Sequence, residues 1–93
     1  MATILSGQKT VTTAGTAVAL GTAQIDGAIL VKALDTNTDV IAIGNDGSND
    51  VTTSNGFRLT AGEQILMDVA NLGSVMLDAA VSGEGVSWLK INA

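Results

Sequence analysis

Turn signals recur about every ten residues along this chain of 93 residues, and they leave room only for short extended segments. Glycine, asparagine and aspartate mark the turns, as in residues 14–16, 35–38 and 82–85. The intervening apolar runs are rich in Val, Ile and Leu and are shorter than an ordinary helix. This spacing predicts an all-β fold, either a small antiparallel β-sandwich or a jelly-roll-like barrel of roughly seven to eight short strands.

The chain offers one segment with a competing interpretation. Residues 64–72 contain several good helix formers, but the segment is short and lies between glycines, which favours a strand with Ile65, Met67 and Val69 on one face. Asp26-Gly27 is read as a turn. The other expected strands are residues 17–20, 28–34, 39–44, 51–53, 74–81 and 86–91.

Two of the expected strands are apolar on both faces. Residues 28–34 are interrupted only by Lys32, and residues 39–43 are apolar after Asp39. Such strands are central in a sheet, or they place one face on the core and the other on a partner. The chain has no proline to protect sheet edges, so a partner or the chain's own N-terminal segment must cover them. We expect residues 1–14 to form an extended N-terminal arm suited to strand addition on a neighbour, and residues 15–93 to form the β-sandwich domain.

Residues 55–63 separate the two halves of the pattern and are predicted to be a corner between strands. Phe57, the single phenylalanine, is expected to anchor this corner in the core. Gly62→Val is predicted to misfold the subunit if Gly62 adopts a positive φ.

The charge and the missing residue types exclude several classes of function. The net charge is −5, and the four basic residues are scattered, which argues against binding nucleic acid or an anionic membrane. The acidity serves solubility or complements a basic partner. The chain contains neither histidine nor cysteine, which removes the common nucleophiles, bases and zinc ligands, so we predict no enzyme, no catalytic residue and no cofactor.

The acidic residues show no catalytic pairing. Asp68 and Asp78 interrupt apolar strands, and we expect both carboxylates to point to solvent. The remaining acids at turns are expected to be solvated as well: Asp26, Asp35, Asp46, Asp50 and Glu84. Trp88 is expected in the core or in a subunit contact, because the two aromatic residues of this chain cannot build a sugar-binding cleft.

Two loops have some of the oxygen ligands that calcium prefers. Residues 35–39 match the first half of a calcium loop, but Val40 stands where glycine is needed, and we predict a polar turn. The loop 45–50, from Asn45 to Asp50, is an alternative loose cation site. No metal site is assigned.

The order of the motifs resembles a family of small virion proteins of tailed bacteriophages. The resemblance rests on a strand ending in Gly44, the segments Ser54-Asn55-Gly56 and Leu59-Thr60-Ala61-Gly62-Glu63, an apolar strand with Asp68-Val69, and the closing Gly85-Val86-Ser87. It covers residues 28–91. It implies a β-sandwich or jelly-roll-like subunit of the phage particle, made in the host cytoplasm and located in the virion, with no catalytic residues to transfer.

The leading hypothesis is therefore a capsid decoration (cement) protein that stabilises the phage head through subunit contacts. Its expected partners are the major capsid protein or other virion proteins, and further copies of itself. A core built from small side chains favours oligomers in general, and the resemblance to virion decoration proteins favours a homotrimer. The alternative is a component of a head or tail fibre or base, or a module that binds host-surface carbohydrate.

Overall fold

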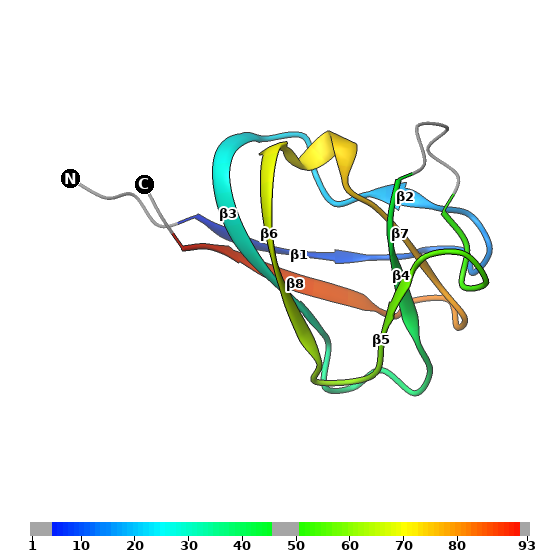
Figure 1. Cartoon of the computed structure of the whole chain (residues 1–93). Coiled ribbons are helices and arrows are strands. Elements are labelled where there is room, and N and C mark those ends of the chain that lie inside the picture. The colour runs from blue at the N-terminus through cyan, green and yellow to red at the C-terminus, as the bar shows by residue number, and fades with distance from the viewer. Residues whose placement is uncertain (1–4, 46–50, 92–93) are drawn as a thin grey trace.

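The computed structural model describes residues 5–45 and 51–91 of the chain. These residues form eight strands and one short 3-10 helix, η1, and no α-helix (Figure 1). The elements in chain order are β1 (Ser6–Thr10), β2 (Val18–Ala19), β3 (Gln24–Ala33), β4 (Ile41–Gly44), β5 (Phe57–Leu59), β6 (Gln64–Asn71), η1 (Leu72–Ser74), β7 (Met76–Ala79) and β8 (Gly85–Lys90).

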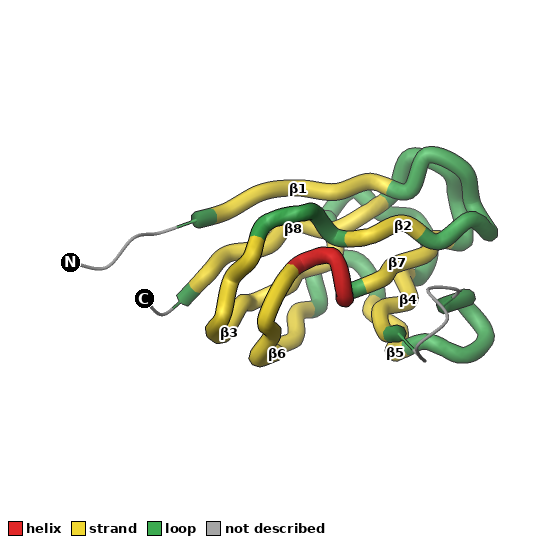
Figure 2. The backbone as a smooth tube through the Cα atoms, turned by 90° about the horizontal axis from the view of Figure 1, so that it is seen from above, coloured by secondary structure: helices red, strands yellow, loops and turns green. Residues whose placement is uncertain are grey.

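The strands form two four-stranded antiparallel sheets that face each other (Figure 2). We call the sheet with the order β1-β8-β3-β6 sheet A, and the sheet with the order β2-β7-β4-β5 sheet B. The pairs β1–β8, β2–β7, β3–β6 and β4–β5 make one long antiparallel ribbon, with the β4–β5 hairpin at its tip. Winding this ribbon into two sheets is the jelly-roll arrangement. The predicted all-β sandwich is thus confirmed.

The core lies between the sheets and contains small aliphatic side chains. In β3, Ile29, Val31 and Ala33 are fully buried and alternate with less buried residues, which is the pattern of a strand with one face on the core. Leu77 and Val86 meet them from the other strands of the sandwich. The predicted thin aliphatic core therefore comes from residues alternating along strands of both sheets.

Several element boundaries differ from the expectations. Residues 64–71 form the strand β6, so the helical alternative for this segment is wrong. Residues 51–53 form no strand, whereas Phe57–Leu59 inside the predicted corner forms β5. Asp26-Gly27 is no turn between strands. It lies within β3, where the register against β6 shifts and Asp26 has a φ of 50°, which indicates a β-bulge.

The outer face of sheet B is covered by the chain's own loops. Ala42, Val51 and Met76 form a second small buried cluster, with Ala17 and Ala19 packed against it. This cluster explains why residues 41–43 are buried at every position, including the side that faces away from the main core. For β4, then, the second apolar face is occupied within the described chain and needs no partner.

The segment expected to be a free arm is partly held in its own sheet. Ser6–Thr10 is extended, as expected, but it pairs along its length with β8 of the same chain, and Lys90 N–H donates to Leu5 O (2.7 Å). While this pairing persists, residues 6–10 are not available for strand addition to a neighbour. The division of the chain at residue 14 stays a prediction.

The corner at residues 55–63 carries the chain from sheet B to sheet A. A turn closes it, in which Thr60 N–H donates to the Glu63 carboxylate (2.7 Å) and Glu63 N–H donates to Thr60 O (2.9 Å). The Thr60 hydrogen bonds lower the pKa of Glu63. The expected anchor is wrong: Phe57 is 59% exposed, and Leu59 is the residue of β5 that enters the core. Phe57 lies on the same face of β5 as Leu59, because the two residues are two positions apart, but it stands at the first position of this edge strand, where it is left open to solvent.

Gly62 has a φ of +82°, which meets the condition set for Gly62→Val, and this substitution is therefore predicted to destabilise the subunit. A β-branched residue is strained in this conformation, and its Cβ would also lie 3.2 Å from Asp35 Oδ1. We expect a loss of about 2 kcal/mol in the free energy of unfolding, which lowers the melting temperature by about 8–16 °C. Thermal denaturation followed by circular dichroism measures it. Gly62→Asn is the control, with a smaller loss, and equal melting of Gly62→Val and wild type would contradict the role of this glycine.

Candidate contact surface

The outer face of sheet A carries a row of leucines at its centre. The register places Leu30 of β3 beside Leu66 of β6 on one side and beside Leu89 of β8 on the other. Leu66 and Leu89 are 57% and 40% exposed, and Ile91, just after β8, is also exposed. Loops of the described chain cover the outer face of sheet B, but no such loops cover the leucine row on the outer face of sheet A. Contiguous apolar patches of this kind mark sites of interaction on soluble domains.

The inner face of β6 is only partly covered. Ile65, Met67 and Val69 point towards sheet B and pack against the edge of the core, but all three keep some exposure. On the side of β6 and β5 the two sheets are apart, which leaves an apolar groove between them. The groove has a volume of about 350 Å³. Besides the three residues of β6, it is lined by residues of sheet B and of the segments next to its strands: Ile43, Gly44, Asn45, Phe57, Ser74 and Val75.

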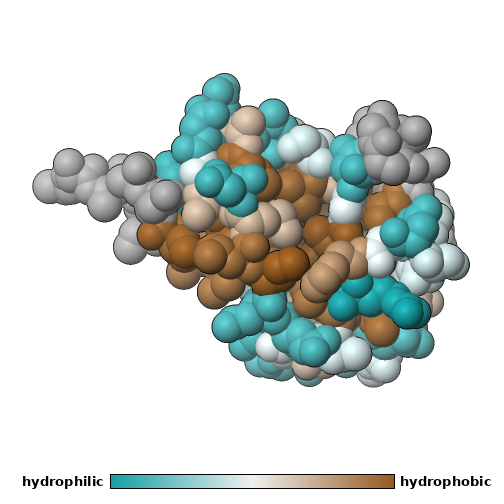
Figure 3. Space-filling view, in the orientation of Figure 1, coloured by the Kyte–Doolittle hydropathy of each residue, from teal (hydrophilic) through white to brown (hydrophobic). Residues whose placement is uncertain are grey.

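The leucine row and the groove flank the same strand. In the view of Figure 3, hydrophobic residues gather in a band that runs from the end of the molecule near the termini towards β4 and β5. We call the leucine row (Leu30, Leu66, Leu89), the inward residues of β6 (Ile65, Met67, Val69) and Phe57 the apolar band. The strand pattern of both faces was visible in the sequence, but the side left open by the fold was not.

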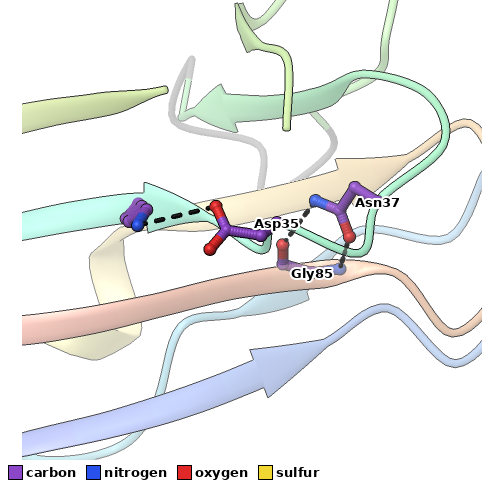
Figure 4. A network of polar contacts seen from close by, with 4 residues as sticks. Asp35, Asn37 and Gly85 are labelled. Carbon is purple, nitrogen blue, oxygen red and sulfur yellow. Dashed lines mark hydrogen bonds and ion pairs between the residues drawn. The ribbon is translucent and has the colours of Figure 1, made fainter. Parts of the chain in front are cut away.

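A polar node lies at the other end of β8, where the 35–40 loop meets Gly85. The Asn37 side chain is buried. Its Nδ2 donates to Gly85 O (2.8 Å), and Gly85 N–H donates to its Oδ1 (3.2 Å), as Figure 4 shows. Asp35, in the same loop, pairs with Lys32 of β3 (3.5 Å). The loop predicted to be a polar turn is therefore a turn that holds the start of β8.

Glu84 holds the same loop from outside, so the expectation that this acid is merely solvated is wrong. Its carboxylate accepts hydrogen bonds from Thr38 N–H (2.6 Å), Thr38 Oγ1–H (2.7 Å) and Asp39 N–H (3.2 Å). The Thr38 hydroxyl is the main cause that lowers the pKa of Glu84 below its ordinary value of 4.5, against a smaller opposing effect of desolvation.

Because its pKa is lowered in the folded protein, the Glu84 carboxylate is predicted to stabilise the fold by an amount that depends on pH. The contribution is present above the unfolded-state pKa near 4.5 and is lost as the pH falls through the lower folded-state pKa. Wild type is thus expected to melt above Glu84→Gln at pH 7, and the difference is expected to shrink towards pH 3. Melting curves across this range measure it. Thr38→Ala, which removes one donor, is the matched control and should reduce the pH dependence; a difference that is constant with pH would contradict the assignment.

Asp78 also departs from its expected place. It is 2% exposed, and its Oδ1 accepts hydrogen bonds from Gly15 N–H (2.9 Å) and Ala79 N–H (2.9 Å). It lies on the outer face of sheet B beneath the loop that contains Gly15, which explains why an acid can be buried in an apolar strand. Asp68 is exposed, as expected, but lies in sheet A, so the two carboxylates do not form a pair.

Among residues 5–45 and 51–91, no group of three acidic side chains is placed to hold a metal ion. The alternative cation site at residues 45–50 lies, apart from Asn45, outside the described residues. Trp88 is half-buried against the core, and its ring lies over Gly7, where a Cβ would meet the indole Nε1 at 2.8 Å. Its position thus agrees with the expected core role. Within the described ranges, no helix is long and apolar enough to cross a membrane.

Comparison with known proteins assigns no family to this chain. No family model matches the chain, and no curated protein matches it. A solved chain from Bacillus endospore appendages, described as a novel family of disulfide-linked pili, is similar at a TM-score of 0.45 and 17% identity, over 100% of this chain and 92% of that chain.

Proposed function

We propose that this chain is a structural subunit of a tailed-phage particle, a capsid decoration protein that binds the major capsid protein through the leucine row of its apolar band. The observation that carries the proposal is the bare outer face of sheet A. Its leucine row is open, while the equivalent face of sheet B is sealed by loops of the same chain. A protein whose work is contact needs such a face, and it needs no reactive site.

Two further arguments support the phage setting. The order of turn motifs over residues 28–91 resembles small virion proteins. Jelly-roll sandwiches are also frequent in viral capsids, although they serve lectins and enzymes too, so this second argument is an analogy of fold. A decoration subunit acts by apolar area buried at many equivalent positions, and many modest contacts add up to a large resistance against internal pressure.

The test is binding to phage heads assembled from the major capsid protein of the phage that, under this proposal, encodes the chain. We expect the purified chain to co-sediment with expanded heads and to raise the temperature at which they break. Leu89→Asp, on the open face, is expected to reduce binding at least tenfold, because it introduces a charge into a desolvated contact. Gln8→Asp, exposed on β1 of the same sheet and outside the leucine row, is the matched control. Heads that never retain the chain would overturn the proposal.

A further inference from the structure

β6 is the one long sheet edge of the described chain that carries little protection against pairing. Natural edges are short or carry basic residues, prolines or bulges. β2 has two residues, β5 has three including Arg58, and β1 carries Lys9. β6 has eight residues without proline or lysine, and within the described residues it pairs only with β3. Its single charge is Asp68.

The backbone of β6 is oriented for a further strand. Ala33 N–H donates to Glu63 O (2.8 Å) where β3 meets the start of β6. Hydrogen-bonded pairs recur at every second residue of an antiparallel ladder, so residues 65, 67 and 69 direct their backbone groups to β3. Gln64, Leu66 and Asp68 then direct theirs to the open edge.

We propose that the strand that pairs with this edge is β6 of a second copy, antiparallel and related by a two-fold axis at Leu66. In this register Leu66 lies opposite the partner's Leu66. Ile65 lies opposite the partner's Met67, and Gln64 opposite the partner's Asp68, so that apolar residues meet apolar ones and each amide can donate to a carboxylate.

The neighbouring registers are worse for a pair of identical strands. With the same orientation of the backbone, moving the axis to Met67 places Leu66 opposite the partner's Asp68. Moving it to Asp68 places the two carboxylates opposite each other, where like charges repel. The sequence of β6 therefore complements itself at Leu66 in a way that an unrelated partner would not require.

The same pairing also closes the groove. A two-fold axis perpendicular to sheet A keeps the inner faces of both copies on one side. The two grooves, each of about 350 Å³, then open towards each other beside Ile65 and Met67, and their apolar linings are removed from water together. The proposed dimer rests on the proposed function in one respect, because both treat the apolar band as a contact surface. The dimer uses the open edge of β6, and Leu89 stays available for the capsid protein.

The mass of the full chain in solution tests the contact. Light scattering over a wide range of concentrations is expected to approach twice the chain mass of 9.3 kDa. Leu66→Lys places two ammonium groups at the axis and is expected to raise the dissociation constant about 100-fold or more. Leu89→Lys lies on the same face, two strands from the edge, and is expected to stay dimeric. A mass of one or of three chains, or equal effects of both variants, overturns the proposal.

Charge variants test the register. Gln64→Glu sits beside Lys32 in its own sheet, so folding is not weakened, but it opposes the partner's Asp68 and is expected to raise the dissociation constant about 2- to 30-fold. Adding Asp68→Lys restores opposite charges across the axis and is expected to restore the dimer. Failure of this rescue, with circular dichroism unchanged, overturns the register. A dimer that does not bind heads contradicts the proposed function alone, and a monomer that binds them contradicts this inference alone.

Discussion

Gly85→Ala is expected to lower the free energy of unfolding by about 3 kcal/mol and the melting temperature by about 12–24 °C. β8 passes so close to β1 at this residue that a Cβ would collide with Lys9 O and would lie 2.6 Å from Thr10 Cα. These are backbone atoms, which cannot turn aside as a side chain can. Thermal or urea denaturation of the purified variant measures the loss.

Gly73→Ala is the matched control for this substitution. A Cβ at Gly73 would find its nearest neighbour, Asn71 Oδ1, at an ordinary distance of 3.4 Å. Its effect is expected to stay within about 0.5 kcal/mol. Similar melting of Gly85→Ala and Gly73→Ala would show that the two strands can separate at Gly85 without loss, contrary to the close approach.

Asn37→Ala is expected to remove about 2–4 kcal/mol of stability. The side chain satisfies both the N–H and the C=O of Gly85 in a buried place, and alanine would leave the N–H without its acceptor. The carbonyl would retain only the bond from Leu34 N–H (3.1 Å). Chemical denaturation is the suitable measurement, since a lower midpoint with an unchanged slope identifies a loss of stability.

Thr36→Ala tests whether the loss is specific to the Asn37 amide. Thr36 is exposed in the same loop, and its replacement is expected to change the stability by less than about 0.5 kcal/mol. Equal midpoints for both variants would mean that water replaces the amide. The node matters for the proposed function because it fixes the start of the strand that presents Leu89 on the open face.

Much of the fold could be predicted from local patterns. Strands recur between glycine and asparagine turns because these residues accept turn conformations. The apolar residues on both faces of residues 28–34 predicted a central strand, or a strand with its second face on a partner. The prediction for Gly62→Val depended on a positive φ at Gly62, and the structure shows that this condition holds. The jelly-roll order, in contrast, joins strands as distant as β1 and β8, and no local pattern encodes such a pairing.

The misplaced side chains share one physical reason. Asp78 and Phe57 were assigned from their residue types, an acid to solvent and an aromatic to the core. The structure reverses both, because a loop covers Asp78 and supplies a backbone donor, while Phe57, at the start of the edge strand β5, is left 59% exposed. Glu84 likewise gains its donors from a loop 46 residues earlier in the chain. Burial depends on what packs over a residue, and that neighbour is distant in sequence.

The sequence by itself determined an all-β chain of short strands with an aliphatic core. It also determined that histidine and cysteine chemistry is absent, because strand alternation, turn residues and composition are local properties. Only the tertiary structure decided which of two equally apolar strands finds its second partner within the chain. β4 is covered by loops of its own chain, while β3, β6 and β8 keep an open face and β6 an open edge. Two strands with the same pattern differ in this way because the path of the connecting loops, and not the strand sequence, determines which apolar surface stays in water.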